Sequence, residues 1–113
     1  MRSLALGLLM LFCIGIAHAN DFMVYGVGNE SCGTYVSEAH NSSAKNLHVT
    51  WASGYLTAMG VWQAVENRAM AKTDVDAIEV WLNNYCQAHP LRDFASAVGE
   101  LARTLMQPER KQH

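Results

Sequence analysis

Hydrophobic residues recur at intervals of three and four positions through most of the chain. This spacing places side chains on one face of an α-helix. The longest such segment covers residues 45–70, and its apolar stripe comprises Leu47, Trp51, Gly54, Tyr55, Ala58, Val61, Trp62, Val65 and Ala69. Ala52, Leu56 and Met59 widen the apolar side, so we expect a central helix that other helices cover. Gly54 has two interpretations, the close approach of a partner helix or a bend.

Three further helices are predicted around this segment. A short one covers residues 31–39 with Ser31 as its N-cap, and another begins at Thr73, which can cap it. The last begins at Pro90, because a missing N–H is harmless in the first turn of a helix. The predicted buried faces of the last two helices comprise Val75, Ile78, Trp81, Leu82, Tyr85 and Cys86, and Leu91, Phe94, Ala95, Val98, Leu101, Ala102 and Leu105.

No stretch of useful length alternates with the period of two that is typical of a strand. The sequence therefore predicts an all-α fold, a small bundle of three main helices plus one short N-terminal helix. Short connections favour antiparallel neighbours. In chain order we expect a signal peptide at 1–19, a flexible lead-in at 20–30, a helical domain at 31–106 and a disordered tail at 107–113.

The N-terminus has the pattern of a secretory signal peptide. Arg2 supplies the positive charge, residues 4–16 form the apolar run, and Ala17 to Ala19 form an A-x-A cleavage site. The run is shorter than the roughly 20 residues that span a bilayer as a helix. We expect cleavage after Ala19, a periplasmic or secreted mature chain, and no stable membrane association after cleavage. The alternative is a short anchor that stays uncut.

Two cysteines, Cys32 and Cys86, remain after this cleavage. An even number of cysteines in an exported chain predicts a structural disulfide between them. The alternatives are a metal pair or a reactive thiol. A metal site would need more Cys or His at short spacing, and neither C-x-x-C nor H-x₃-H is present. Because Cys86 lies on the apolar face of its helix, we expect an internal staple.

The chain shows no recognised catalytic motif. It has no G-x-S-x-G, no H-E-x-x-H and no spaced cluster of carboxylates. Four histidines remain after cleavage, His40, His48, His89 and His113, and they are scattered. We interpret them as surface or capping residues, with pH sensing as the functional alternative. We therefore expect no enzyme, no catalytic residue and no bound metal.

Charge and glycine spacing disfavour two further classes of ligand. The mature chain carries seven Lys and Arg residues, all of those in the chain except Arg2, against ten Asp and Glu residues, and the basic residues are scattered. Electrostatic binding of nucleic acid is not expected from such a chain. Gly26 and Gly28 lack the third glycine and the GK[ST] of a phosphate-binding loop, so no nucleotide cofactor is expected.

Trp51, Trp62 and Trp81 all lie on predicted apolar stripes. Packing in the core is the default interpretation of such residues. The alternative is that some of them, together with Tyr55, form a surface that binds a protein partner, because tryptophan is enriched at binding hot spots.

Several of these residues resemble a known pattern. The order is Cys32, then Trp51-x-x-Gly54-Tyr55-Leu56-x-x-x-Gly60, then Trp81-Leu82-x-x-Tyr85-Cys86-x-x-x-Pro90 and an alanine-rich last helix. It resembles small exported bacterial proteins, the acid-stress chaperones of the HdeA/HdeB type and the Rap/Tai immunity proteins of type VI secretion. The resemblance implies a compact helical periplasmic protein with a disulfide between its first and third helices, and it allows a homodimer.

The resemblance implies two functions, both non-enzymatic and both based on protein binding. As an acid-stress chaperone, the protein would expose apolar surface at low pH and hold unfolded clients. As an immunity protein, it would bind a secreted toxic effector. The extra cysteine pair that such immunity proteins usually carry near the Gly-Tyr helix is replaced here by Trp51 and Ala52.

Overall fold

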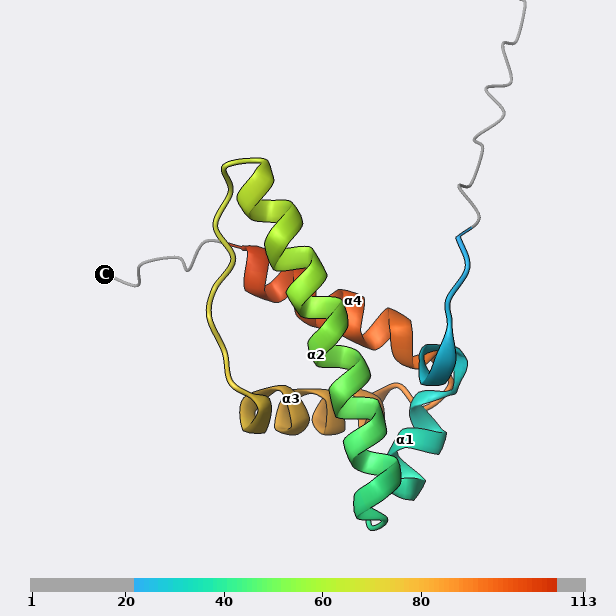
Figure 1. Ribbon diagram of the computed structural model, residues 1–113. Helices are drawn as coiled ribbons and strands as arrows, with labels where there is room; N and C mark the ends of the chain where they lie inside the picture. Colours follow the sequence, from blue (N-terminus) through green and yellow to red (C-terminus); the bar gives the residue numbers. More distant parts are fainter. Residues whose placement is uncertain (1–21, 108–113) are drawn as a thin grey trace, which may run out of the picture.

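The computed structural model describes residues 22–107, and the predicted signal peptide and the end of the predicted tail lie outside them. The elements in chain order are the 3₁₀-helix η1 (Gly26–Asn29) and the α-helices α1 (Cys32–Glu38), α2 (Ser42–Val65), α3 (Val75–Ala88) and α4 (Phe94–Met106). In Figure 1, the long helix α2 lies across α3 and α4, and α1 packs beside α3. The described residues contain no strand, so the predicted all-α bundle of three main helices and one short one is confirmed.

A polar side chain caps the N-terminus of each α-helix. The Ser31 hydroxyl accepts a hydrogen bond from the Thr34 N–H as predicted, while Asn41, Asp74 and Asp93 cap the other three helices. These caps satisfy N–H groups that have no partner inside a helix.

The caps correct three predicted helix boundaries. Asn41 starts α2 three residues earlier than predicted, and Asp74 rather than Thr73 caps α3. The last helix does not begin at Pro90, because the chain turns there and Asp93 caps α4.

The end of α2 also differs from the prediction. The helix ends at Val65 instead of continuing to residue 70, because Asn67 adopts a left-handed conformation with φ of 53°. Asparagine tolerates this conformation better than most residues, and it commonly follows the end of a helix. The loop after α2 is held by a hydrogen bond from the Ala71 N–H to the Leu105 carbonyl of α4.

All four α-helices contribute to one hydrophobic core. Its fully buried members include Cys32 and Tyr35 from α1, Ala52 from α2, Leu82 and Cys86 from α3, and Phe94, Ala97 and Val98 from α4. Burial raises the pKa of Tyr35 to about 12, and the nearby charge of Glu79 acts in the same direction, so this phenol stays neutral.

The predicted buried stripe of α2 is only partly right, since Trp51 and Tyr55 pack against the core but several other members face solvent. The helix turns His48, Val49, Ala52, Leu56 and Gln63 inward, and it leaves Leu47, Val61, Trp62 and Val65 exposed. No atom lies within 4 Å of the position that a Gly54 Cβ would take, so a close helix contact at this glycine is also excluded among the described residues.

Two further residues predicted to be buried are exposed in the structure. Val75, at the start of α3, is 54% exposed. Leu91 is 97% exposed, because it lies in the turn before α4 instead of in the helix. The other residues of the predicted α3 and α4 faces are buried or partly buried.

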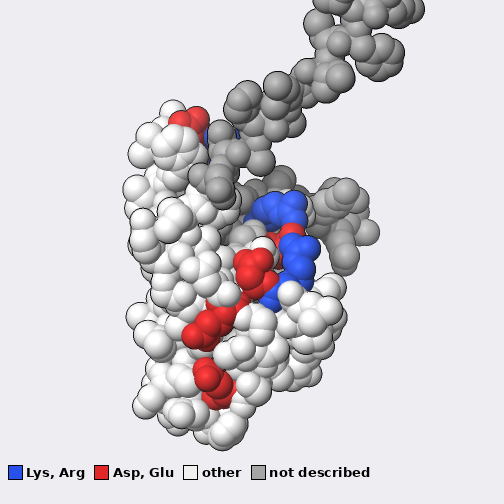
Figure 2. Space-filling model, turned by 90° about the vertical axis from the view of Figure 1, so that its right-hand side faces the viewer, with Lys and Arg blue, Asp and Glu red and all other residues white. Residues whose placement is uncertain are grey.

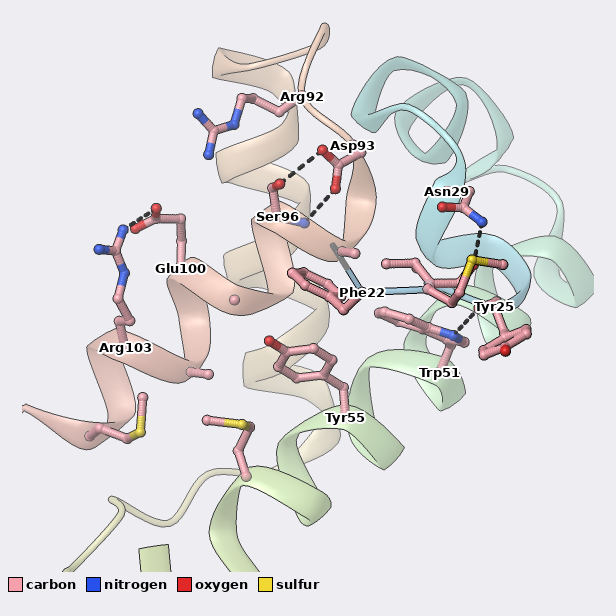
Figure 3. Close-up of a pocket in the computed structure, with 17 residues that line it drawn as sticks. Phe22, Tyr25, Asn29, Trp51, Tyr55, Arg92, Asp93, Ser96, Glu100 and Arg103 are labelled. Carbon is pink, nitrogen blue, oxygen red and sulfur yellow. Dashed lines mark hydrogen bonds and ion pairs between the residues drawn. The ribbon is translucent and has the colours of Figure 1, made fainter. Parts of the chain in front are cut away.

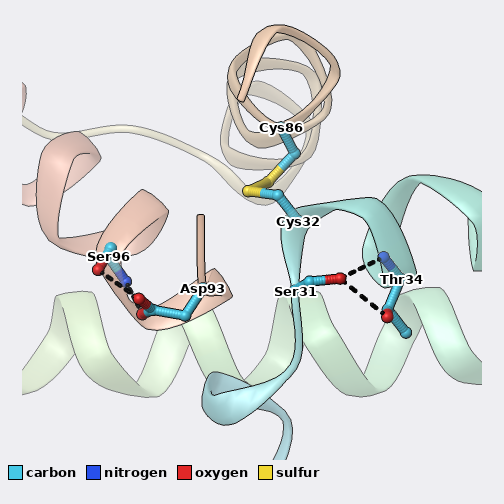
Figure 4. The surroundings of a disulfide bond; sticks show 6 residues. All are labelled: Ser31, Cys32, Thr34, Cys86, Asp93 and Ser96. Carbon is cyan, nitrogen blue, oxygen red and sulfur yellow. Dashed lines mark hydrogen bonds between the residues drawn. A yellow bond between two sulfur atoms is a disulfide. The ribbon is translucent and has the colours of Figure 1, made fainter. Parts of the chain in front are cut away.

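The predicted disulfide joins Cys32 at the start of α1 to Cys86 near the end of α3, across a sequence separation of 54 (Figure 4). Both cysteines are fully buried, as expected for an internal staple. Backbone hydrogen bonds support the same junction, since the Cys32 N–H donates to the Arg92 carbonyl at 2.7 Å and the Phe94 N–H to the Glu30 carbonyl at 2.8 Å. The disulfide fits an oxidising compartment.

Within residues 22–107, no helix has both the length and the apolar composition needed to cross a membrane. The segment before α1 also differs from the expected flexible lead-in. Residues Gly26–Asn29 form η1, which packs against α2 and α4 and buries Val27 and Gly28.

Candidate functional site

A groove of about 1090 Å³ lies between α2, α4 and residues 22–25 (Figure 3). We call it the α2–α4 groove. Its apolar lining is dominated by aromatic and methionine side chains, chiefly Phe22, Met23, Trp51, Tyr55, Met59 and Met106. Phe22 and Met23 are largely exposed and the other four are half-buried, so the groove is open to solvent beside residues 22–25.

Trp51 positions the N-terminal wall of the groove. Its indole N–H donates to the Tyr25 carbonyl at 2.8 Å and so ties this segment to α2. Gly28 lies directly against the indole ring, where a Cβ would collide with it. Gly26 has a φ of 71°, a conformation that glycine adopts most readily. The two glycines therefore allow the segment to fold closely over Trp51.

The opposite wall is the polar side of α4. Arg103 pairs with Glu100 one turn away, and Asp93 accepts hydrogen bonds from the Ser96 N–H and hydroxyl, each at 2.8 Å. Burial alone would raise the pKa of Asp93, but these hydrogen bonds and the neighbouring Arg92 hold it below its ordinary value. The wall therefore presents both signs of charge beside an apolar floor.

Acidic and basic side chains also lie side by side on the molecular face shown in Figure 2, and most of the rest of that face is uncharged. A field of one sign, which nucleic acid binding requires, is not present on this face.

The structure separates the four residues of the predicted partner surface. Trp51 and Tyr55 lie together in the α2–α4 groove, with ring centroids 5.7 Å apart. Trp62 is 56% exposed and lies further along α2, outside the lining of the groove. Trp81 packs against the core and stacks on Tyr85, with centroids 5.2 Å apart. Only Trp51 and Tyr55 therefore belong to one surface.

Sequence reasoning missed the remaining apolar lining of the groove. Phe22 and Met23 fall in the segment that was expected to be a flexible lead-in, and Met106 lies at the end of α4. The available signal was the cluster of apolar residues from 22 to 25, which the expected signal peptide would leave near the new N-terminus.

A second exposed apolar surface follows the solvent side of α2. This outer face of α2 comprises Leu47, Val61, Trp62 and Val65. All four residues are exposed and none of them lines the α2–α4 groove, so this face is a separate apolar surface.

The described histidines occupy three different environments. His40 is exposed in the turn after α1. His89 caps the C-terminus of α3, with its ring 4.4 Å from that of Tyr85. His48 is only 1% exposed, which contradicts its interpretation as a surface or capping residue. His113 lies outside the described residues.

Comparison of the chain with protein-family models, curated proteins and solved structures finds no significant match. The resemblance to HdeA/HdeB chaperones and Rap/Tai immunity proteins therefore stays a prediction from the quoted residues.

Proposed function

We propose that this chain is an exported, non-enzymatic protein that binds apolar segments of other proteins in the α2–α4 groove. The observation that carries the proposal is the aromatic and methionine lining of the groove, of which Phe22 and Met23 are exposed and the rest is half-buried. Methionine side chains are flexible and polarizable, and they are common at surfaces that accept varied partners. Trp51 and Tyr55 add large, stiff contact surfaces of the kind enriched at binding hot spots.

The shape of the site favours one mode of recognition. A groove between two helices accepts an amphipathic helix or another segment that presents apolar residues on one side. The Glu100–Arg103 pair on α4 then faces the polar side of the bound segment. Such rim charges contribute to orientation more than to affinity.

In its concrete form, the protein is an acid-stress chaperone that holds unfolded clients. As the pH falls through the lowered pKa of Asp93, its protonation removes the charge that caps α4. This change loosens the polar wall, and the protein becomes strongly positive and more open.

Light scattering of an acid-unfolded client tests this function at about pH 2–3, a range below the ordinary carboxylate pKa values, and at pH 7. The wild-type mature chain should suppress aggregation at the acidic pH. The double variant Phe22→Ser/Met23→Ser should lose this suppression while keeping its fold, because both side chains are exposed.

The matched control is Val61→Ser/Val65→Ser, which removes two exposed apolar residues from the outer face of α2. This variant should protect the client as well as the wild type does. Absence of protection by the wild type would contradict the chaperone function. Loss of protection in the control but not in the groove variant would contradict the groove as its site.

A further inference from the structure

Three potential metal ligands from separate parts of the sequence meet beside the core. They are Glu30, which follows η1, Glu38, the last residue of α1, and His48 in α2. One ligand atom from each side chain lies within 4.8 Å of those of the other two. Their spacing along the chain matches no metal-binding motif, which explains why the sequence analysis expected no metal.

His48 has the orientation of a ligand. Its side chain is 1% exposed, and its ring packs between Tyr35 and Phe94, with centroids 5.3 and 4.9 Å away. Its Nδ1 lies 2.9 Å from the Ala44 carbonyl, which can only accept, so Nδ1 carries the hydrogen. In the neutral ring, Nε2 therefore presents its lone pair to the two carboxylates.

The contact between His48 and Glu30 lacks the geometry of a hydrogen bond. The His48 Nε2 lies 2.9 Å from the Glu30 Oε2, yet neither buried atom has a hydrogen-bond partner. With a protonated ring this contact would be an ion pair, whereas in the neutral tautomer with hydrogen on Nδ1 both atoms are acceptors and repel each other at this distance. A bound cation between them removes the repulsion and satisfies both atoms.

The charges around the cluster also favour a cation. Glu38 stands at the C-terminal end of α1, where the helix dipole disfavours a carboxylate. Among residues 22–107, no Lys or Arg forms an ion pair with Glu30 or Glu38, and Lys45 pairs with Glu79 instead. Two carboxylates thus face one imidazole, and no Lys or Arg of the described residues is paired with either of them.

We propose that Glu30, Glu38 and His48 bind one Zn²⁺ ion. Imidazole nitrogen and carboxylate oxygen are both ordinary zinc ligands, at 2.0–2.2 Å from the metal, which places neighbouring ligand atoms about 3.3 Å apart in a tetrahedron. The His48 Nε2 and Glu30 Oε2 atoms lie 2.9 Å apart and all three ligand atoms lie within 4.8 Å of one another, so small side-chain rotations suffice. A water completes the fourth position, and the hydrogen bond from Nδ1 to Ala44 is the outer-shell contact typical of zinc-bound histidine.

The bound ion would link three elements that otherwise meet through apolar packing. It fastens the segment after η1 and the end of α1 to α2. Because the metal binds the folded state, it should raise the thermal unfolding midpoint in proportion to the logarithm of its concentration above the dissociation constant.

Isothermal titration of the mature chain with Zn²⁺ in a chelator-free buffer tests the proposal. One equivalent should bind, and Glu30→Gln and Glu38→Gln should each weaken binding at least about tenfold, since even outer-shell changes weaken metal sites by 10–100-fold. The matched controls Glu66→Gln and His89→Gln, which change a carboxylate and an imidazole outside the cluster, should bind as the wild type does. Ca²⁺ should not bind, because it prefers sites made only of oxygen.

A second measurement, ¹⁵N NMR, tests whether His48 is a zinc ligand without substituting it. In ¹⁵N spectra, the His48 Nε2 resonance should shift on addition of Zn²⁺ while Nδ1 keeps its hydrogen. Failure of Zn²⁺ to bind at one equivalent would overturn the proposal. It would also be overturned by equal binding to the wild type and both Glu variants, by loss of binding in the His89 control, or by equal affinity for Ca²⁺.

Discussion

Gly28 and Gly54 are two glycines with opposite surroundings. Gly28 lies against the Trp51 ring and the Val24 side chain, so any Cβ there collides with both. Gly54 is within α2 and has open space where its Cβ would be. Replacing each glycine with alanine therefore measures two different effects on stability. At Gly28 it measures the cost of a steric collision, and at Gly54 it measures the cost of having glycine inside a helix.

Gly28→Ala should destabilise the fold by about 1–3 kcal/mol, the usual cost of overpacking, and should displace residues 22–25 from Trp51. Gly54→Ala should stabilise the fold by up to about 1 kcal/mol, because alanine is the better helix former. Urea unfolding followed by tryptophan fluorescence measures both effects. Equal stability changes in the two variants would contradict the described packing.

The ionisation of Asp93 makes the stability of the fold depend on pH. The pKa of this carboxyl is lowered in the folded protein, so the ionised form stabilises the fold above the ordinary value of 3.8, and this contribution is lost as the pH falls through the lowered pKa. Asp93→Asn keeps an acceptor for the Ser96 N–H but does not titrate.

At pH 7, the unfolding free energy of the wild type should be higher than that of Asp93→Asn by up to about 1 kcal/mol, because the variant lacks the negative charge at the N-terminus of α4. The difference should shrink to near zero at about pH 2, below the ordinary carboxylate range. Urea titrations at a series of pH values measure it. A difference that stays constant or grows toward acid pH would show that Asp93 does not titrate in this way.

Among the elements, the apolar periods of the sequence were sufficient to predict the four α-helices, but of their N-caps only Ser31 was predicted correctly. The apolar periods were not sufficient to orient α2. This helix is apolar on nearly all sides, and its buried face includes the polar residues His48 and Gln63, while Trp62 and Val65 face solvent. Periodicity could not choose between two apolar faces, because the choice depends on which face α3 and α4 cover.

The two leucines of α2 test this orientation with one substitution. Leu56 is 7% exposed and packs in the core, whereas Leu47 is 59% exposed. Leu56→Ala should cost about 2–4 kcal/mol of unfolding free energy by leaving a cavity. Leu47→Ala should change it by less than about 0.5 kcal/mol. The reverse order in thermal or urea unfolding would restore the orientation predicted from the sequence.

The candidate groove was less predictable than the helices. Trp51 and Tyr55 were identified from their residue types. The segment that completes the groove comes much earlier in the chain, since Tyr25, whose carbonyl accepts the Trp51 indole hydrogen bond, lies 26 positions before Trp51. Such a long-range contact has no local signature. The Glu30, Glu38 and His48 cluster escaped prediction for the same reason, since its members meet only after α1 folds back on α2.

At the scale of the whole molecule, the disulfide joins the start of α1 to the end of α3. Replacing both cysteines with serine, Cys32→Ser/Cys86→Ser, should cost about 4 kcal/mol on the loop-closure model for a loop of this length. Denaturant unfolding with and without reductant measures the loss. The wild type should lose stability on reduction, and the double variant should not respond. A response of the variant to reductant would contradict the assignment.

The central claim is that apolar protein segments bind in the α2–α4 groove, and the three tryptophans offer a direct test of it. Trp51 lies in the groove, Trp62 on the outer face of α2 and Trp81 against the core. The measurement is the NMR spectrum of the three indole N–H groups during titration with an amphipathic helical peptide, at pH 7 and at about pH 3. The account predicts that the Trp51 resonance shifts most and that Trp62 stays unchanged. A shift of Trp62 without Trp51, or no shift at either pH, would contradict it.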